Sequence, residues 1–355
     1  MDDEARRDSD PRDDLDPVVD SASDDLFDQH VTGAFEAVFE PADTDPDAAA
    51  DPDAYADGPP TGAQTTEWFN VEDFLALDDE LPALPRREHH VAAVVVSHDG
   101  EVWLPAVLTT LAAQTRLPDT AVGVDTGSVD ASAQLLEGSF GPDRTVVLTD
   151  AAGFGAAVSA GLERLGPRAH EPFAPDVVSW VWLLHDDSAP DVACLARLLD
   201  TADDNPSAAV LGPKVLGWHD RRLLLEAGVT VSGAGRRVTG LERREHDQGQ
   251  HDGVRDVLAV SSAGMLVRRD VWDALGGFDP ALPLFRDDLD FCWRAQRMGE
   301  RVIVATDAVI HHREASAHGR RADDIAPRPH RADREAAVHV LLAHATALGA
   351  PFVAL

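Results

Sequence analysis

Three short clusters of polar residues follow apolar runs, and their side chains are of the kinds that bind metal ions and phosphates. The clusters occupy residues 97–99 (SHD), 125–128 (DTGS) and 185–187 (HDD). A single aspartate after a strand usually caps the next helix. Three such clusters at one sheet edge instead favour a ligand site. Because Mg²⁺ and Mn²⁺ take carboxylate and phosphate oxygens together, we expect Asp187 to be a metal ligand.

A fourth cluster, LFRDDLDFCWRAQRM at residues 284–298, contains three carboxylates within four residues: Asp287, Asp288 and Asp290. Acidic side chains at the start of a helix interact favourably with the positive end of the helix dipole, and each can stabilise the helix by about 0.3–1 kcal/mol. Carboxylates this close together also repel one another and raise the pKa of at least one of them, which suits a general base. We therefore expect this loop to accept a proton during catalysis.

The elements that must position these clusters alternate between strands and helices. Apolar patterns predict strands at residues 91–97, 121–125, 145–148, 177–184 and 301–310, and helices at residues 103–114 and 155–165. The first strand, VAAVVVS, is a continuous β-branched run typical of a parallel strand buried on both faces. This order predicts a doubly wound α/β sheet, in which ligands bind at the carboxyl ends of the strands.

The acidic charge lies mostly in the first 80 residues, which hold 26 Asp and Glu and three Arg, whereas the whole chain has a net charge of −34. Residues 1–64 have too few apolar side chains to repay the entropy of ordering, so we expect a disordered acidic tail. Residues 65–88 are expected to be a linker with a short apolar segment, which either caps the next domain or binds a partner. The negative charge of the chain repels the phosphate backbones of nucleic acids, so we expect no nucleic acid partner.

Residues 89–322 are expected to form the folded domain, followed by a C-terminal helical segment at residues 323–355. The apolar run from 338 to 355 is slightly shorter than the roughly 20 residues of a membrane span. This end is therefore either the start of a span or a docking helix. Cys194 and Cys292 lie in apolar helical segments without metal-ligand spacing, which fits a reducing compartment. With no apolar, positively charged signal at the start, we expect a cytoplasmic protein.

Six segments resemble, in this order, motifs of the family 2 glycosyltransferases. They are VAAVVVSHDGEVWLPAVLTTLAAQT, VGVDTGSVDAS, GFGAAVSAGL, WVWLLHDDSAP, GMLVRRDVWDALGGFDPALPLFRDDLDFCWRAQRMGERV and DAVIHH, within residues 91–320. Each motif alone is common, but the ordered set is specific. The chain resembles bacterial rhamnosyl- and galactofuranosyl-type transferases of the cell envelope. This resemblance implies a GT-A fold, a Rossmann-like doubly wound mixed α/β sheet with flanking helices.

By position, the resemblance assigns the nucleotide-sugar donor to strand ends and one loop. The donor-binding positions are Ser97, Asp125, Gly153, Phe154, Gly155, His185 and Asp186. Asp125 corresponds to the residue that bonds the base, Ser97 to a nucleoside contact, and residues 153–155 to the loop beneath the nucleotide. Asp187 corresponds to the last acid of the family's DxD element. His185 stands where the family has the first acid, a departure that weakens the expected metal affinity and leaves the metal's identity open.

The resemblance also places the metal ligands and the catalytic acids. His312 stands where the family often has a metal-binding histidine, and strand register favours it over His311. Mg²⁺ or Mn²⁺ is the expected cofactor, held by Asp187 and His312. The family's Glu-Asp pair falls on Asp287 and Asp288, which assigns proton removal to Asp288 with Asp287 beside it.

The implied reaction is inverting transfer of a hexosyl or deoxyhexosyl group from a nucleotide diphosphate sugar to a hydroxyl of a glycan or lipid-linked acceptor. The expected setting is synthesis of cell-envelope polysaccharide or glycolipid at the inner face of the cell membrane, with membrane association. No Q-x-x-R-W element follows the acidic loop, which favours single additions over processive polymerisation.

Two alternatives remain open. A sugar nucleotidyltransferase is expected to begin with a Gly-rich basic loop for a triphosphate, and VSHDGEVW has no lysine or arginine. A nucleotide-sugar-binding protein without catalysis is favoured by His185 and opposed by Asp187, Asp288 and His312.

Two arginine pairs, Arg236-Arg237 and Arg243-Arg244, lie between Gly233 and Gly253 in a polar stretch with few signals of regular structure. This stretch is either a solvated loop or a lid. In a lid, the arginines would bind a phosphate of the acceptor.

Overall fold

The computed structural model describes residues 87–149, 152–166, 177–320 and 328–345. The strands are β1 (Glu88–Ser97), β2 (Thr120–Asp125), β3 (Thr145–Val147), β4 (Val177–His185), β5 (Ser188–Pro190), β6 (Ala208–Gly217), β7 (Leu224–Glu226), β8 (Thr230–Val231), β9 (Arg237–Val238), β10 (Val254–Asp256), β11 (Leu266–Arg268) and β12 (Arg301–His312). The α-helices are α3 (Leu104–Ala112), α4 (Ser132–Phe140), α5 (Phe154–Leu165), α6 (Cys194–Asp204), α7 (Arg269–Leu275), α8 (Asp287–Arg297) and α9 (Pro329–His344). The expected tail at residues 1–64 and linker at residues 65–88 lie outside the described residues, except for Arg87 and Glu88.

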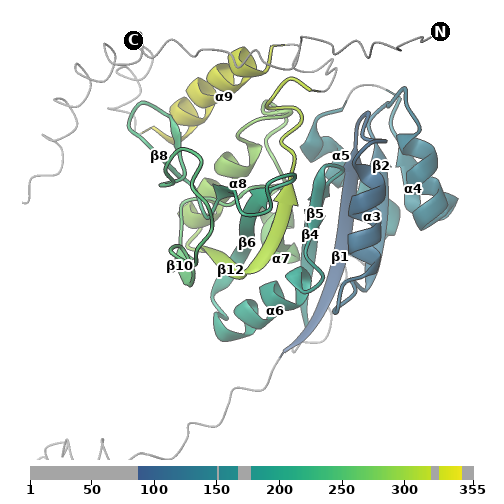
Figure 1. The fold of residues 1–355 in the computed structure, drawn as a ribbon, viewed down its shortest axis with the longest axis horizontal. Helices are drawn as coiled ribbons and strands as arrows, with labels where there is room; N and C mark the ends of the chain where they lie inside the picture. Colours follow the sequence, from purple (N-terminus) through teal and green to yellow (C-terminus); the bar gives the residue numbers. More distant parts are fainter. Residues whose placement is uncertain (1–86, 150–151, 167–176, 321–327, 346–355) are drawn as a thin grey trace, which may run out of the picture. The chain divides into compact units, whose positions relative to one another are not determined.

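A ten-stranded mixed sheet forms the centre of the fold (Figure 1), with strand order β10-β12-β6-β11-β4-β1-β2-β3. β5 pairs with β12 and β7 with β6, whereas β8 and β9 form a separate two-stranded sheet. Each predicted strand and helix is present, and the doubly wound mixed α/β sheet expected from the sequence is confirmed.

The direction of the strands brings the predicted clusters to one edge. β1 runs parallel to β2 and β4, and β6 runs parallel to β12. The intervening strand β11 is antiparallel to both β4 and β6, so β6 and β12 run the same way as β4. The carboxyl ends at Ser97, Asp125, His185 and His312 therefore point to the same side of the molecule. Ser97 is opposite Asp125 in the register, and His185 is opposite Val96.

Alternate side chains of the central strands enter two hydrophobic cores, one on each face of the sheet. Trp180 and Trp182 of β4 pack with residues of α3 and α6, whereas Val181 and Leu183 pack with residues of α5, α7 and α8. Because both faces are covered, apolar side chains are needed at successive positions rather than at every second one. The continuous apolar run of β1, which is buried throughout residues 91–97, has the same cause.

The helix α9 packs against α8, the helix that carries the acidic cluster (Figure 1). Its Val340 is buried in the core that also contains residues of α5, α7 and α8. No helix in the described part of the chain is long and apolar enough to cross a membrane. α9 covers only part of the apolar run from 338 to 355, and residues 346–355 lie outside the described ranges, so both alternatives for the C-terminal segment stay open.

Candidate functional site

Asp125, expected to bind the base, is fixed at the end of β2 and retains one unpaired oxygen. The side chain is buried, and its Oδ1 accepts the backbone N–H groups of Gly127 and Ser128, each at 3.0 Å. Gly127 has φ 88°, a left-handed conformation that glycine adopts without strain. Oδ2 is buried without a hydrogen-bond partner in the described residues. A buried carboxylate oxygen of this kind is suited to accept an N–H from a ligand.

Asp186 and Ser97, both expected at the donor, are bonded to each other at the sheet edge. The Ser97 hydroxyl donates to Asp186 Oδ2 at 3.0 Å, and the backbone N–H of His98 donates to the same oxygen at 2.9 Å. A Cβ at Gly100 would lie 2.1 Å from that oxygen, so only glycine fits there. These contacts hold the loop after β1 against the end of β4.

His185, Asp187 and His312 form a group that could hold a metal ion. One ligand atom from each lies within 4.8 Å of the others. Asp187 Oδ1 is 3.2 Å from His312 Nε2, and Asp187 Oδ2 accepts the backbone N–H of Ala315 at 2.9 Å. Burial lowers the pKa of His312, but the charge and hydrogen bond of Asp187, together with the charges of Glu314 and Glu226, outweigh burial and the pKa lies above its usual value. Two imidazoles and one carboxylate suit Mn²⁺ better than Mg²⁺, which prefers oxygen ligands.

The neighbouring histidine, His311, lies outside this group. Its Nε2 is 3.2 Å from Asp191 Oδ1, and its Nδ1 contacts the carbonyl oxygen of Gly217. Successive residues of a strand point to opposite faces, which explains why the register separates the two histidines.

The three carboxylates of the acidic cluster are all buried but differ in their contacts. Asp290 Oδ1 is 2.8 Å from His344 Nε2, and its Oδ2 accepts Arg294 Nε at 2.7 Å, so Asp290 belongs to the interface with α9. Asp288 is bound by Arg237 of β9. Asp287 accepts the backbone N–H of Asp288 at its Oδ1, and its Oδ2 is buried without a partner among the described residues.

Two groups near this cluster were not singled out by the sequence. Glu226, at the end of β7, binds the same arginine as Asp288, with Oε2 2.7 Å from Arg237 Nη2. Burial raises the pKa of Glu226, although the charge of Arg237 opposes the rise. Arg286, just before α8, has φ 62° and binds Asp333 of α9 through Nε at 2.6 Å and Nη2 at 3.0 Å. Glu226 lies in none of the motifs above, and although Arg286 lies within residues 284–298, no local signal marks its contact with Asp333 of α9.

Two adjoining cavities lie at this edge of the sheet. The smaller, of about 90 Å³ and here named the strand-end cavity, is lined by residues that include His98, Thr126, Phe154, Asp186 and Pro283. The larger, of about 350 Å³ and here named the acidic cavity, is lined by residues that include Glu226, Arg237, Asp288, Glu314 and Asp333. Both are lined by His185, Asp187, Ser262, Leu284, Asp287 and Ser316. His185 and Asp187 of the candidate metal group therefore lie with Asp287 where the two cavities join, and His312 lines the acidic cavity.

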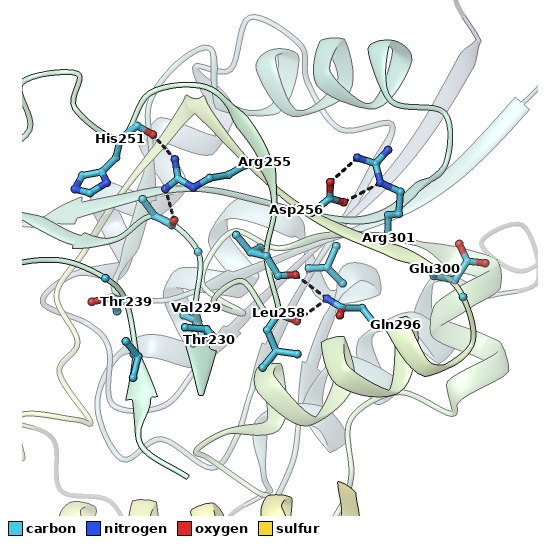
Figure 2. A pocket seen from close by; sticks show the side chains of 17 residues that line it. Val229, Thr230, Thr239, His251, Arg255, Asp256, Leu258, Gln296, Glu300 and Arg301 are labelled. Carbon is cyan, nitrogen blue, oxygen red and sulfur yellow. Dashed lines mark hydrogen bonds and ion pairs between the residues drawn. The ribbon is translucent and has the colours of Figure 1, made fainter. Parts of the chain in front are cut away.

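A larger cavity, of about 730 Å³, lies beside the start of β12 and the end of α8 (Figure 2). Arg255 and Gln296 each donate to two backbone carbonyl oxygens there, and Arg301 binds Asp256. These groups are used to build the wall of the cavity. None of the predicted site residues lines it, so we place the site at the two joined cavities instead.

Gly153 is expected to tolerate no larger side chain. A Cβ there would lie 2.7 Å from the backbone of Pro283, which lines the strand-end cavity. We expect Gly153→Ala to lower the free energy of unfolding by about 1–3 kcal/mol and to weaken nucleotide binding, because residues 283–284 must move. Gly138 of α4 has no neighbour within 4 Å of an added Cβ, so Gly138→Ala is the matched control. Denaturant unfolding of both variants checks this, and equal stability of the two would contradict it.

A family model described as "Glycosyltransferase like family 2" matches residues 87–323. Among curated proteins, N-acetylglucosaminyl-diphospho-decaprenol L-rhamnosyltransferase of Mycobacterium tuberculosis is 24% identical over 245 residues, which cover 64% of this chain and 77% of that protein. O-antigen biosynthesis protein RfbC of Myxococcus xanthus is 38% identical over 78 residues, 22% of this chain and 6% of that protein.

Solved structures that are similar to this chain include the mannosyltransferase PcManGT from Pyrobaculum calidifontis in complex with GDP-Man and Mn²⁺. Its TM-score is 0.44 at 15% identity, covering 80% of this chain and 84% of that one. GalNAc-T7 with UDP, GalNAc and Mn²⁺ has a TM-score of 0.46 at 14% identity, covering 63% of this chain and 43% of that one. The present chain thus matches less than half the length of GalNAc-T7.

Proposed function

The chain belongs to the family 2 glycosyltransferases, and we propose that it moves a sugar from a nucleotide diphosphate donor to an acceptor hydroxyl in a metal-dependent, inverting reaction. The observation that carries this proposal is the junction of the two cavities, where a candidate metal group and an acidic pair come together. One cavity is available to each substrate, so donor and acceptor would be held in line across the junction.

On the donor side, the nucleotide would lie over the carboxyl ends of the strands and enter the strand-end cavity with only part of its volume, since that cavity measures about 90 Å³. Phe154 lines this cavity and would lie beneath the nucleotide together with Gly153. Asp125 lines neither cavity but directly precedes Thr126, which lines the strand-end cavity, and would accept an N–H of the base at its Oδ2. His185, Asp187 and His312 fit a divalent cation, because they offer two imidazole nitrogens and a carboxylate oxygen within a short distance of one another. When bound, such an ion supplies the positive charge that stabilises a departing nucleoside diphosphate.

On the acceptor side, the acidic cavity would hold the hydroxyl that attacks. The pair Asp287 and Asp288 lies in this cavity, and one of the two carboxylates would take the hydroxyl proton as the oxygen attacks the anomeric carbon. One displacement of this kind inverts the configuration of the sugar. Arg237 and Arg286, which line the acidic cavity, are each paired with carboxylates of the same cavity. Arg237 is therefore not available to bind a phosphate of the acceptor, which disfavours a lid in which it has that role.

The relative from Mycobacterium tuberculosis has a name that describes rhamnosyl transfer to a lipid-linked sugar. This name supports a lipid-linked or glycan acceptor, and with it a role in cell-envelope synthesis at the inner face of the membrane. We assign the catalytic domain to residues 89–322, with Mn²⁺ or Mg²⁺ as cofactor.

A screen of UDP-, GDP- and dTDP-sugars with Mn²⁺ tests the proposal, with release of the nucleoside diphosphate followed by mass spectrometry. We expect release from at least one donor, faster with a polyprenyl-diphosphate sugar present and absent with EDTA. A sugar nucleotidyltransferase would instead form pyrophosphate from a nucleoside triphosphate and a sugar 1-phosphate. A binding protein without catalysis would retain the nucleoside diphosphate and release no sugar. Either outcome would contradict the proposal.

A further inference from the structure

We propose that Asp287, and not Asp288, is the general base, and that Arg237 and Glu226 hold Asp288 out of that role. This inference rests on the proposed transfer reaction and identifies its proton acceptor. The assignment departs from the prediction based on motif position, which gave the role to Asp288. It depends on what each of the two carboxylates contacts.

Asp288 is occupied at both oxygens. Arg237 Nη1 lies 3.0 Å from Oδ1 and Arg237 Nη2 lies 2.9 Å from Oδ2, which is a bidentate ion pair. The backbone N–H of Leu289 also donates to Oδ1 at 2.7 Å. A guanidinium keeps its charge at any physiological pH. Both oxygens of Asp288 are therefore already used by donors within the protein, and neither is left for the hydroxyl of an acceptor.

Arg237 is itself held from a second side, so it cannot easily release Asp288. Its Nη2 lies 2.7 Å from Glu226 Oε2, and Glu226 Oε1 accepts the backbone N–H of Ser261 at 2.8 Å. The arginine comes from β9 and the glutamate from the end of β7, so two different strands fix its position. One cation is shared between two buried carboxylates, and Asp287 has no part in the pair.

Asp287 has the free oxygen. Its Oδ1 accepts the backbone N–H of Asp288 at 2.9 Å, whereas its Oδ2 is buried and has no hydrogen-bond partner in the described part of the chain. The residue is 3% exposed and lines both the strand-end cavity and the acidic cavity. The other carboxylate that lines both cavities, Asp187, contacts His312 and the N–H of Ala315. Asp287 thus lines the junction where donor and acceptor would meet, and its Oδ2 is the carboxylate oxygen that no other described group occupies.

The protonation behaviour of Asp287 agrees with this geometry. Burial, followed by the charge of Asp288, raises the pKa of Asp287 well above its usual value. A general base works best when its pKa is near the operating pH. The pKa of an exposed aspartate is far below that pH, so a raised pKa suits this role. Asp288, in contrast, has both of its oxygens bound by Arg237.

In the proposed step, the O–H bond of the acceptor breaks and its proton moves to Asp287 Oδ2. The acceptor oxygen forms a bond to the anomeric carbon of the donor. The bond between that carbon and the diphosphate oxygen breaks, and its electron pair leaves with the nucleoside diphosphate. Asp287 then returns the proton to water.

Matched amide substitutions test the proposal with the sugar nucleotide that the wild-type enzyme turns over. We expect Asp287→Asn to lower kcat by roughly 10²–10⁴-fold, with the affinity for Mn²⁺ and for UDP, GDP or dTDP unchanged by calorimetry. Asp288→Asn is expected to lower kcat by less than about tenfold, because the amide oxygen still accepts one bond from Arg237. Asp270→Asn, on the exposed surface of α7, controls for the loss of a carboxylate.

A double variant separates pairing from catalysis. If Asp288 serves only to pair with Arg237, Arg237→Gln/Asp288→Asn should have the same kcat as Arg237→Gln alone. Asp287→Asn should keep its full effect when added to Arg237→Gln. If Asp288→Asn alone fails to fold, the double variant still shows whether Asp288 is needed for turnover, because it removes the positive and the negative charge of the ion pair together.

Loss of kcat by more than about 100-fold in Asp288→Asn, with unchanged melting temperature and nucleotide affinity, would overturn the proposal. So would an Asp287→Asn variant that keeps more than a tenth of the wild-type kcat. Failure of the transferase function itself would be seen earlier and separately, as a wild-type protein that releases no nucleoside diphosphate from any donor.

Discussion

Asp187→Ala is expected to abolish the effect of Mn²⁺ on nucleoside diphosphate binding, with a loss of affinity of roughly 100-fold or more. Loss of a group that merely supports a metal ligand already costs about 10–100-fold, and Asp187 is the one carboxylate of the proposed metal group. Without the ion, the diphosphate would face Asp287, Asp288 and Glu226 in the adjoining cavity, with Arg237 already paired. Calorimetry of UDP, GDP and dTDP with and without Mn²⁺ measures this effect.

The two adjacent histidines provide a matched control for the metal site. His312→Ala should weaken the Mn²⁺-dependent binding in the same way, because His312 Nε2 lies 3.2 Å from Asp187 Oδ1. His311→Ala removes a buried imidazole from the next position but leaves the metal group intact. Equal nucleotide affinity of all three variants, or equal affinity of the wild type with and without Mn²⁺, would exclude this metal site.

Asp333→Ala is expected to lower kcat by about 100-fold, the cost of displacing a catalytic group by roughly 1 Å. Asp333 of α9 holds the guanidinium of Arg286, which has φ 62° and directly precedes Asp287. A positive φ in a residue other than glycine is strained and persists only where the surroundings enforce it. Without Asp333, we expect the Arg286 backbone to relax and Asp287 to leave the cavity junction.

Glu335→Ala provides the control for this prediction, because Glu335 lies on the same helix and pairs with the exposed Arg331. Its kcat should equal that of the wild type, since an exposed ion pair contributes little. Nucleotide affinity should be unchanged in both variants, because the strand-end cavity is built from other residues. If Asp333→Ala keeps normal turnover, α9 is not needed to position the catalytic loop.

The sheet and the edge that carries the site could be predicted from local patterns in the sequence. The apolar run of β1 and the alternation of strands with helices are properties of neighbouring residues, and they identify a doubly wound sheet. The topology then brings the residues after β1, β2 and β4 together without further information. Short antiparallel strands such as β5, β7 and β11 were not predicted, because three residues are too few to show a period.

The partners of the acidic pair could not be predicted, because they lie far apart in the sequence. Arg237 is 51 residues from Asp288 and Glu226 is 11 residues from Arg237, so no spacing rule connects them. Position in the motif predicted Asp288 as the base, but a motif does not show which carboxylate an arginine occupies. The contact of His344 with Asp290 likewise depends on the docking of α9.

The anomeric configuration of the transferred sugar tests the central claim most directly. The product formed with Mn²⁺ and the donor identified by the screen would be examined by NMR. We expect a glycoside whose configuration is opposite to that of the donor, formed by the wild type and not formed with EDTA or by Asp187→Ala. A product with retained configuration, or transfer that continues undiminished with EDTA, would contradict a metal-dependent single displacement.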